Sequence, residues 1–391
     1  MTAPWKEWIP GALNDFQLRE LITQGFIEHA EDCKPDYSSF DLRLGNEGYK
    51  MLKGSIKPQG GGYGQFLSSN SAFAAPLSFD NNTVILAPKN TYVFKLKEKL
   101  AMKLDTSKIH GQATAKSSVG RVDVLARLIV DGMHSYEEFD DTMWGRNGGS
   151  GDGSMFLEVT PLTFNVRVKV GTSLSQLRLF QGKPDHSKIR GKELYEAVLI
   201  GEGTSHDERL RVDVTNTRID GEEVAAYCAK YENKQPINLW VDKDHNGKSL
   251  NRPNPRDYWN FEMSDKERFY VKHPNFYILR SKEKINLPRG VCVYCRAIDE
   301  TLGEMRIHYA GFVHPYFGYS DKSEHQPGTP LIFEVRGHDV DVVLNNNEPL
   351  ARLQFYRMSQ DCSEEPDPKM ISPYNNQTLR LSQFFEDFPE K

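Results

Sequence analysis

The chain contains the stretch Phe156–Val159, which reads Phe-Leu-Glu-Val, and a matching stretch, Ile332–Val335, which reads Ile-Phe-Glu-Val. A second pair precedes these: Lys97–Leu100 reads Lys-Glu-Lys-Leu, and Lys282–Ile285 reads Lys-Glu-Lys-Ile. Motifs that recur in the same order indicate two copies of one structural unit. The repeat therefore predicts a tandem architecture.

Strand-like patterns dominate both halves. The sequence has 17 Tyr, 21 Phe, 30 Gly and 21 Pro, a composition typical of short strands separated by turns. In the first half, residues 12–30 predict one amphipathic helix and Gln59–Gly64 predicts a loop. We expect an all-β fold of the sandwich or barrel type. The strands expected in the first copy are Thr83–Ala87, Tyr92–Leu96, Leu100–Leu104, Ile109–Ala113, Val122–Ile129, Met155–Thr160, Phe164–Val170 and Leu174–Phe180.

The length of 391 residues fits two domains, because a single core rarely grows beyond ~300 residues. We place copy one at residues 1–190 and copy two at residues 205–391, with a polar junction near 185–205. The segment Leu210–Val214 is expected to open copy two as Phe40–Leu44 opens copy one.

The overall charge is nearly balanced. A net charge of -5, from 49 basic and 54 acidic residues, argues against a surface that holds a nucleic-acid duplex. The five cysteines are few and unevenly spaced, as expected for free thiols in a reducing compartment. We find no signal peptide and no apolar run of membrane-spanning length, so we expect a soluble, cytoplasmic protein.

The segment Ala113–Arg121 places two cations, two hydroxyls and a glycine within nine residues. Such a segment can direct backbone N–H groups, hydroxyls and positive charges at one anion, and a polyphosphate is the natural candidate. A polar turn with two solvated basic side chains has the same composition. In copy two the corresponding position is Asp299–Glu304, where acids replace both cations, so we expect no phosphate binding there.

These motifs resemble those of the dCTP deaminases in the trimeric dUTPase superfamily. Lys116–Arg121 is similar to their phosphate-binding Arg-Ser-Ser-Leu-Ala-Arg element, and Ser39–Gly45 to their Asp-Leu-Arg-Leu-Gly strand. Phe156–Val159 resembles the catalytic Leu-Glu strand, and Gln176-Leu177 the Gly-Gln-Leu strand that follows it. Tyr374–Gln377 resembles the Tyr-x-x-Gln lid. The order spans the chain as in the long bacterial form of dCTP deaminase.

The resemblance implies two tandem dUTPase-like distorted jelly-roll (β-clip) barrels with a few short helices. It also implies hydrolytic deamination of dCTP to dUTP and ammonia, with a glutamate as proton shuttle and Mg²⁺ carried by the triphosphate. We expect a homo-oligomer, and three tandem chains would match the family's three-barrel ring. Carried over by position, the catalytic residues would be Glu158, Ser117 and Arg121, and the substrate-binding residues Lys116, Ser118, Asp131, Gln176, Tyr374 and Gln377.

The choice of glutamate remains open at the level of sequence. Glu158 lies between apolar neighbours, where burial would raise its pKa toward the useful range, but a strand glutamate can also face solvent. Its repeat partner Glu334 is a second candidate, because in the resembling trimers loop and glutamate come from neighbouring subunits. Asp131 stands in a segment that departs from the family's pattern, because the family's Ile-Asp-Pro-Gly turn reads Ile-Val-Asp-Gly here.

Three other interpretations stay in view. A zinc deaminase would need a His-x-Glu beside its Cys-x-x-Cys, and Cys292–Cys295 has none, so we expect no zinc. A dUTP pyrophosphatase or bifunctional enzyme would need a water positioned by an aspartate, for which Asp131 is the only candidate. A non-catalytic nucleotide-binding module would bind dCTP and release no ammonia. The acidic, Gly-rich segment 133–153 could form a lid over any of these sites.

Overall fold

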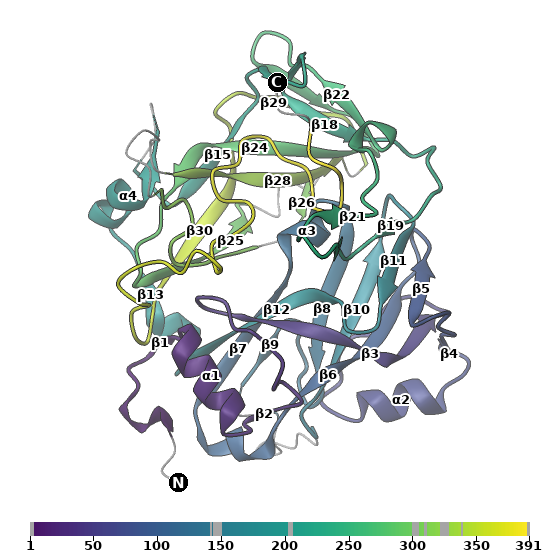
Figure 1. The fold of residues 1–391 in the computed structure, drawn as a ribbon, viewed down its shortest axis with the longest axis vertical. Helices are drawn as coiled ribbons and strands as arrows, with labels where there is room; N and C mark the ends of the chain where they lie inside the picture. Colours follow the sequence, from purple (N-terminus) through teal and green to yellow (C-terminus); the bar gives the residue numbers. More distant parts are fainter. Residues whose placement is uncertain are drawn as a thin grey trace.

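A computed structural model describes residues 4–140, 143, 151–201, 206–298, 305–308, 311–320, 328–337 and 339–388. Two β-rich bodies are stacked in it, with copy one below and copy two above (Figure 1). The all-β class with tandem barrel-like sheets is thus confirmed. Copy two's Asp299–Glu304 segment, and residues 141–142 and 144–150 of the expected lid, lie outside the described residues.

Copy one is built on a sheet whose strands follow the order β8-β10-β6-β3-β12-β7-β9. Alternate side chains of these strands enter one large apolar cluster, as the period of two requires. The strands of copy one are β1 (Gly11–Ala12), β2 (Ile27–Glu28), β3 (Phe40–Met51), β4 (Ala74–Pro76), β5 (Thr83–Leu86), β6 (Tyr92–Leu100), β7 (Ile109–Ala115), β8 (Val124–Val130), β9 (Glu138–Phe139), β10 (Ser154–Pro161), β11 (Val166–Lys169) and β12 (Ser173–Gln181).

Copy two repeats this plan, with β24 central and flanked by β15, β18 and β28. The junction strands β13 and β14 pair with β30 and β24, so they belong to this second sheet. The strands of copy two are β13 (Lys188–Ile189), β14 (Leu199–Ile200), β15 (Arg209–Asp213), β16 (Thr217–Ile219), β17 (Glu222–Val224), β18 (Ala226–Ala229), β19 (Ile237–Asn238), β20 (Asp242–Lys243), β21 (Ser249–Leu250), β22 (Trp259–Glu262), β23 (Arg268–Val271), β24 (Phe276–Ile285), β25 (Val291–Ala297), β26 (Met305–His308), β27 (Gly311–Val313), β28 (Thr329–Gly337), β29 (Val342–Asn345) and β30 (Pro349–Arg357).

An ion pair between an arginine and a buried glutamate recurs in both copies and fixes their correspondence. Arg43 Nε donates to Glu98 at 2.6 Å, and Arg211 Nη1 donates to Glu283 at 3.0 Å. The backbone N–H of each arginine also donates to its glutamate, at 2.7 Å in both copies. Arg211 therefore corresponds to Arg43, which shifts the expected match of Leu210–Val214 with Phe40–Leu44 by two residues. A shift of two keeps every side chain on the same face of the strand, so the sequence pattern could not detect it.

The helices are few and short: α1 (Asp15–Thr23), α2 (Tyr63–Ser69), α3 (Ser117–Gly120) and α4 (Lys192–Val198). The expected helix within residues 12–30 is confirmed as α1, which starts with a capping box between Asn14 and Gln17. Residues 63–69, partly expected to be loop, form α2. The strand expected at Leu100–Leu104 is wrong, because β6 continues to Leu100 and a 3₁₀ turn, Met102–Thr106, follows. None of the helices that the structure describes has the length and apolar character needed to span a bilayer.

The two copies are packed against one another through an extensive contact. The core of copy one continues onto the outer face of copy two, where Trp259, Phe276 and Ile278 join the same apolar cluster. The last described residues, 371–388, run back across this junction, and Phe385 packs against Trp259. Between the copies, the Arg336 guanidinium pairs with the buried carboxylate of Asp123. The sequence repeat alone did not predict how the copies would face each other.

Candidate active site

The phosphate-loop candidate lies at the junction of the two copies, where α3 follows β7 (Figure 1). Lys116 occupies the N-cap position with extended backbone, and one helical turn, Ser117–Gly120, follows. This geometry brings the Arg121 side chain back toward Ser117, whose hydroxyl accepts a hydrogen bond from Arg121 Nε at 3.1 Å. The segment is therefore a compact turn that points from copy one toward copy two.

Arg121 is almost completely buried, with 2% exposure. Its Nη1 donates to Gln377 Oε1 and to the Arg380 carbonyl, each at 2.9 Å, and its guanidinium stacks 3.8 Å from the Tyr374 ring centroid. Burial lowers the pKa of Arg121, although Tyr374 and Glu334 act in the opposite direction and raise it. The guanidinium thus links the loop of copy one to the C-terminal segment.

The C-terminal segment covers the loop from the other side. The hydroxyls of Ser118 and Tyr374 lie 2.8 Å apart, and Ser382 Oγ donates to the Ser118 carbonyl at 2.8 Å. Gln377 Nε2 donates to the Pro330 carbonyl of copy two at 2.9 Å. Tyr374 and Gln377 were carried over by resemblance as lid residues, and both contact the loop in this closed arrangement.

Glu334 of β28 faces the same loop. A Cβ added at Gly120 would lie 2.2 Å from Glu334 Oε2, so the carboxylate packs directly on the glycine. Glu334 is 6% exposed, and burial raises its pKa well above the usual value; Arg121 opposes this shift and Asp123 adds to it. Within the described part of the chain, no donor is hydrogen-bonded to the Glu334 carboxylate.

A cavity of about 110 Å³ lies between these groups. Copy one contributes the α3 loop, copy two contributes Glu334 and β27, and the C-terminal segment closes it. The residues that line it are Ala115, Lys116, Ser117, Gly120, Arg121, Cys295, Gly311, Phe312, Val313, His314, Phe317, Leu331, Ile332, Glu334, Ser372, Tyr374 and Gln377.

The wall of this cavity formed by Phe312–His314 is fixed by residues of copy one. Arg178 of β12 is fully buried; it donates to the Val293 carbonyl at 3.0 Å and to Ser38 Oγ at 3.1 Å, and stacks 4.0 Å from the Phe312 ring. Ser38 Oγ lies 2.9 Å from His314 Nδ1. Burial lowers the pKa of His314, which favours its neutral form. Sequence reasoning missed this wall, because its parts come from distant segments without a motif.

Lys116, Asp131 and Gln176 have different surroundings. Lys116 lines the cavity, but its ammonium pairs with Asp41. Asp131 lies apart and accepts a hydrogen bond from the backbone N–H of Tyr63 at 2.9 Å. Gln176 accepts one from Ser39 at 3.4 Å and is not part of the cavity lining. The structure therefore brings Lys116 to the site and places Asp131 and Gln176 outside it.

Glu158, the first choice from sequence, also lies outside the cavity. It projects from the outer face of β10, where Arg127 donates to Oε1 through Nε at 3.1 Å and Nη2 at 2.5 Å. Tyr136 donates to Oε2 at 3.2 Å. Both oxygens are engaged, and Glu334 is the glutamate beside the phosphate-loop candidate. The role of Glu158 as proton shuttle stays a prediction, and this geometry favours Glu334.

Cys292 and Cys295 do not form a paired site. Residues three apart on a strand point to opposite faces. Cys292 is fully buried with Phe180 and Tyr356, whereas Cys295 lines the cavity, where burial and Glu334 raise its pKa to about 12. A shared metal would need both thiols on one side.

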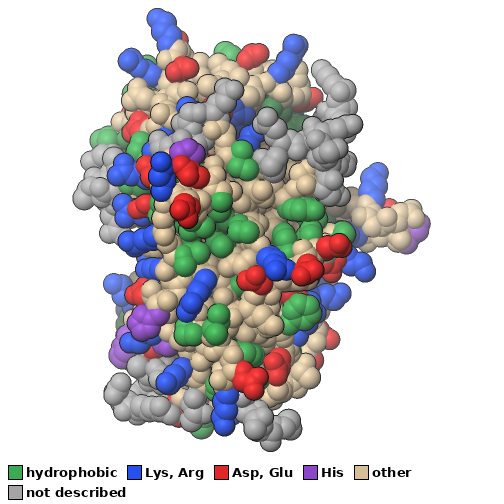
Figure 2. Space-filling model, turned by 90° about the vertical axis from the view of Figure 1, so that its left-hand side faces the viewer, with side chains coloured by type: hydrophobic (Ala, Val, Ile, Leu, Met, Phe, Trp, Pro, Cys, Tyr) green, Lys and Arg blue, Asp and Glu red, His purple; other side chains and the backbone are tan. Residues whose placement is uncertain are grey.

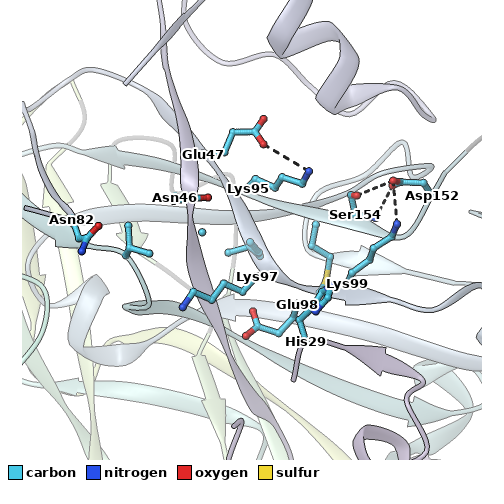
Figure 3. A pocket seen from close by; sticks show the side chains of 14 residues that line it. His29, Asn46, Glu47, Asn82, Lys95, Lys97, Glu98, Lys99, Asp152 and Ser154 are labelled. Atoms are coloured by element: carbon cyan, nitrogen blue, oxygen red, sulfur yellow. Dashed lines mark hydrogen bonds and ion pairs between the residues drawn. The ribbon is translucent and has the colours of Figure 1, made fainter. Parts of the chain in front are cut away.

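A larger groove of about 660 Å³ lies elsewhere on copy one (Figure 3). Lys95 pairs with Glu47 at 3.7 Å, and Lys99 with Asp152 at 3.4 Å. These paired, half-exposed charges form a solvated surface rather than an anion cradle. The face shown in Figure 2 likewise mixes both signs of charge with small apolar patches.

Comparisons with known proteins identify the family of this chain. A model of the 2'-deoxycytidine 5'-triphosphate deaminase C-terminal domain matches residues 187–385, and a model of the corresponding N-terminal domain matches residues 9–183. The comparison with curated protein sequences gave no significant match. Among solved structures, the fold is similar to a 2'-deoxycytidine 5'-triphosphate deaminase from Agrobacterium tumefaciens, with a TM-score of 0.75 and 24% identity over 90% of this chain and 96% of that one. The chain belongs to the family of 2'-deoxycytidine 5'-triphosphate deaminases, enzymes that convert dCTP to dUTP and ammonia.

Proposed function

We propose that this chain deaminates dCTP at the cavity between its two copies, with Glu334 as the proton shuttle. The observation that carries the proposal is the position of the Glu334 carboxylate, buried directly against Gly120 of the phosphate-loop candidate. Burial raises its pKa, which suits a group that must both accept and release protons near neutral pH. Ser117, Arg121 and Glu334 then lie in one site within a single chain.

In this mechanism water adds to C4 of the cytosine ring. Glu334 takes a proton from the water as the C–O bond forms and delivers it to N3. It then moves the remaining hydroxyl proton to the amino group, so that the C–N bond breaks, ammonia leaves and the C4 carbonyl forms. The net reaction is dCTP plus water to dUTP plus ammonia. No redox step and no phosphoryl transfer are required, and one carboxylate serves each proton transfer in turn.

The triphosphate is assigned to the α3 turn and the C-terminal segment. Lys116, Ser117, Ser118 and Arg121 supply cations and hydroxyls, which suit phosphate oxygens. These donors include no cluster of carboxylates for a protein-held cation, so Mg²⁺ would be held by the nucleotide's own phosphates. Arg121 and Lys116 are occupied by protein partners in the closed arrangement. When the nucleotide enters, Arg121 must therefore exchange its contact with Gln377 for a phosphate oxygen, and Lys116 must exchange its contact with Asp41.

The pyrophosphatase alternative gains no support from the geometry. It depended on Asp131 positioning a water, and Asp131 holds the backbone N–H of Tyr63 instead. Zinc independence, a homo-oligomer of three chains and a cytoplasmic location remain predictions. The cytoplasmic location is supported by the free thiols of Cys33, Cys228, Cys292, Cys295 and Cys362.

The test is steady-state ammonia and pyrophosphate release from dCTP and Mg²⁺ by Glu334→Gln, with Glu158→Gln as the repeat-matched control. We expect Glu334→Gln to lose roughly 10²-fold or more in kcat, because glutamine cannot carry the proton. We expect Glu158→Gln to keep kcat within about threefold. An active Glu334→Gln protein beside an inactive Glu158→Gln protein would overturn the assignment, and pyrophosphate release would show a bifunctional enzyme.

A further inference from the structure

The outer face of β28 in copy two is equivalent to the outer face of β10 in copy one, but different segments of the chain cover the two faces. On β28, Phe333 and Val335 point into the core of copy two, so Ile332 and Glu334 point outward, toward copy one. On β10, Leu157 and Val159 point inward, so Phe156 and Glu158 occupy the equivalent outward positions. The face that receives a phosphate loop in copy two therefore also exists in copy one.

In copy one this face is covered by the chain itself. Residues 52–76, which contain α2, pack against it in one small apolar cluster. The Tyr63 and Phe156 rings lie 5.4 Å apart, and Leu67 belongs to the same small apolar cluster. A Cβ added at Gly64 would lie 3.0 Å from Phe156, so the helix is in close contact with the strand. We call residues 52–76 the plug.

Polar contacts hold the plug in place beside Glu158. The Tyr136 hydroxyl lies 3.2 Å from Glu158 Oε2 and 3.4 Å from the Ile56 carbonyl, so it touches both the glutamate and the plug. Asp131 accepts from the N–H of Tyr63, one of the free N–H groups at the start of α2. Arg127 binds the other oxygen of Glu158 and stacks 4.1 Å from the Tyr136 ring. These contacts give Glu158, Tyr136 and Asp131 a shared structural role.

The partner that this face would need is also altered in sequence. A second site would combine Glu158 with a phosphate loop from copy two. The strand registers place Ile298, rather than the expected Asp299, at the position of Lys116, because the N–H of Ile298 donates to the Leu350 carbonyl as that of Lys116 donates to the Leu174 carbonyl. The sequence that follows, Asp299–Glu304, contains three acids and no lysine or arginine. Acids repel a triphosphate. Copy one thus keeps the loop and closes its glutamate face, whereas copy two keeps the glutamate and has changed its loop.

We propose that the plug permanently occupies the docking face of copy one, so that each chain has one dCTP site and Glu158 anchors the plug instead of moving protons. This inference rests on the proposed function, because it takes the Glu334 cavity as the working site. Figure 1 shows α3 near the junction of the two copies and α2 lower on copy one.

The test is the number of nucleotides bound per chain, measured on the full-length protein by equilibrium dialysis. Glu334→Gln is saturated with dCTP and Mg²⁺, and wild type is saturated with the product dUTP. We expect each preparation to bind one nucleotide per chain at saturation. Two nucleotides per chain in either preparation would overturn the inference. This count is independent of catalysis, so it separates a failed inference from a failed proposed function.

Variants of the plug give a second readout. Tyr136→Phe removes one hydrogen bond at Glu158, and Tyr63→Ala removes the ring that packs on Phe156. We expect faster proteolytic cleavage within residues 52–76 in both variants, with kcat within about twofold of wild type. If Glu158 served a second site, Glu334→Gln would keep about half of the ammonia release and Tyr136→Phe would reduce it. That pattern would refute the plug and leave the Glu334 site standing.

Discussion

Replacing Gly120 by alanine is expected to disable the enzyme without unfolding it. The added Cβ would lie 2.2 Å from Glu334 Oε2, whereas ordinary contacts of a Cβ begin near 3.4 Å. The carboxylate must therefore retreat by about 1 Å. It is the far end of a flexible side chain, so it can rotate away at little cost in stability. A displacement of about 1 Å at a reacting group can cost on the order of 10²-fold in rate.

We therefore expect kcat for ammonia release to fall by about 10²-fold in Gly120→Ala, with a melting temperature within about 2 °C of wild type. The control is a double-mutant cycle with Glu334→Gln. If alanine acts only by displacing the Glu334 carboxylate, then Gly120→Ala has no further effect in the Glu334→Gln background. Full activity in Gly120→Ala, or independent losses in the cycle, would refute the claim that this carboxylate works at its present position.

Three further predictions follow from the contacts described. The raised pKa of Glu334 means that the folded protein holds this proton more tightly than the unfolded chain does. The contribution of the proton to stability is therefore complete below the unfolded pKa near 4.5 and is lost as pH rises toward the folded pKa. Glu334→Gln should then melt at a higher temperature than wild type at neutral pH, and equal melting temperatures from pH 4 to pH 8 would contradict this. Arg336→Met should lower the free energy of unfolding by about 3–5 kcal/mol in chemical denaturation, because it removes the arginine that pairs with the buried carboxylate of Asp123. The control is Arg256→Met at an exposed ion pair, which should lower the free energy of unfolding by less than about 1 kcal/mol. Tyr374→Phe removes the hydroxyl that is hydrogen-bonded to Ser118 and to the backbone N–H of Gln383, and such a hydrogen bond contributes about 1 kcal/mol of free energy. We therefore expect KM for dCTP to rise about fivefold with kcat retained. An unchanged KM would argue against a lid role for Tyr374.

Much of the fold could be predicted from the sequence because it follows from local patterns. The alternation of apolar residues gave most strands of copy one, and Asn14 with Gln17 marked the start of α1. The repeated Lys-Glu-Lys motifs indicated two copies, whose buried arginine–glutamate pairs are equivalent. The family and its reaction followed from five motifs in the right order, and the domain models agree.

The composition of the site could be predicted only in part, since it depends on how the copies face each other. Ser117 and Arg121 carry a local motif, and Tyr374 and Gln377 carry another. The choice between Glu158 and Glu334 cannot be made from sequence, because both stand in the same strand pattern. The structure distinguishes the two by what covers each outer face, α2 in one case and α3 in the other, and this difference supports the proposal of Glu334.

The plug was missed for a related reason. Gly60, Gly61 and Gly62 have positive φ angles and form a loop, as their composition predicts. The helix that follows, α2, is only seven residues long, so packing of Tyr63 and Leu67 with Phe156 stabilises it more than helix propensity does. Sequence patterns describe such short segments poorly, because tertiary contacts decide their conformation.

The measurement that tests the central claim most directly is complementation between two inactive proteins. Arg121→Ala removes the loop cation, and Glu334→Gln removes the proposed proton shuttle. Co-expression of the two chains, with different affinity tags, allows every possible assembly to form. If loop and glutamate meet within one chain, the mixture releases no more ammonia than its components. Restored ammonia release, approaching a quarter or more of wild type, would show that the site is shared between chains and would contradict the account.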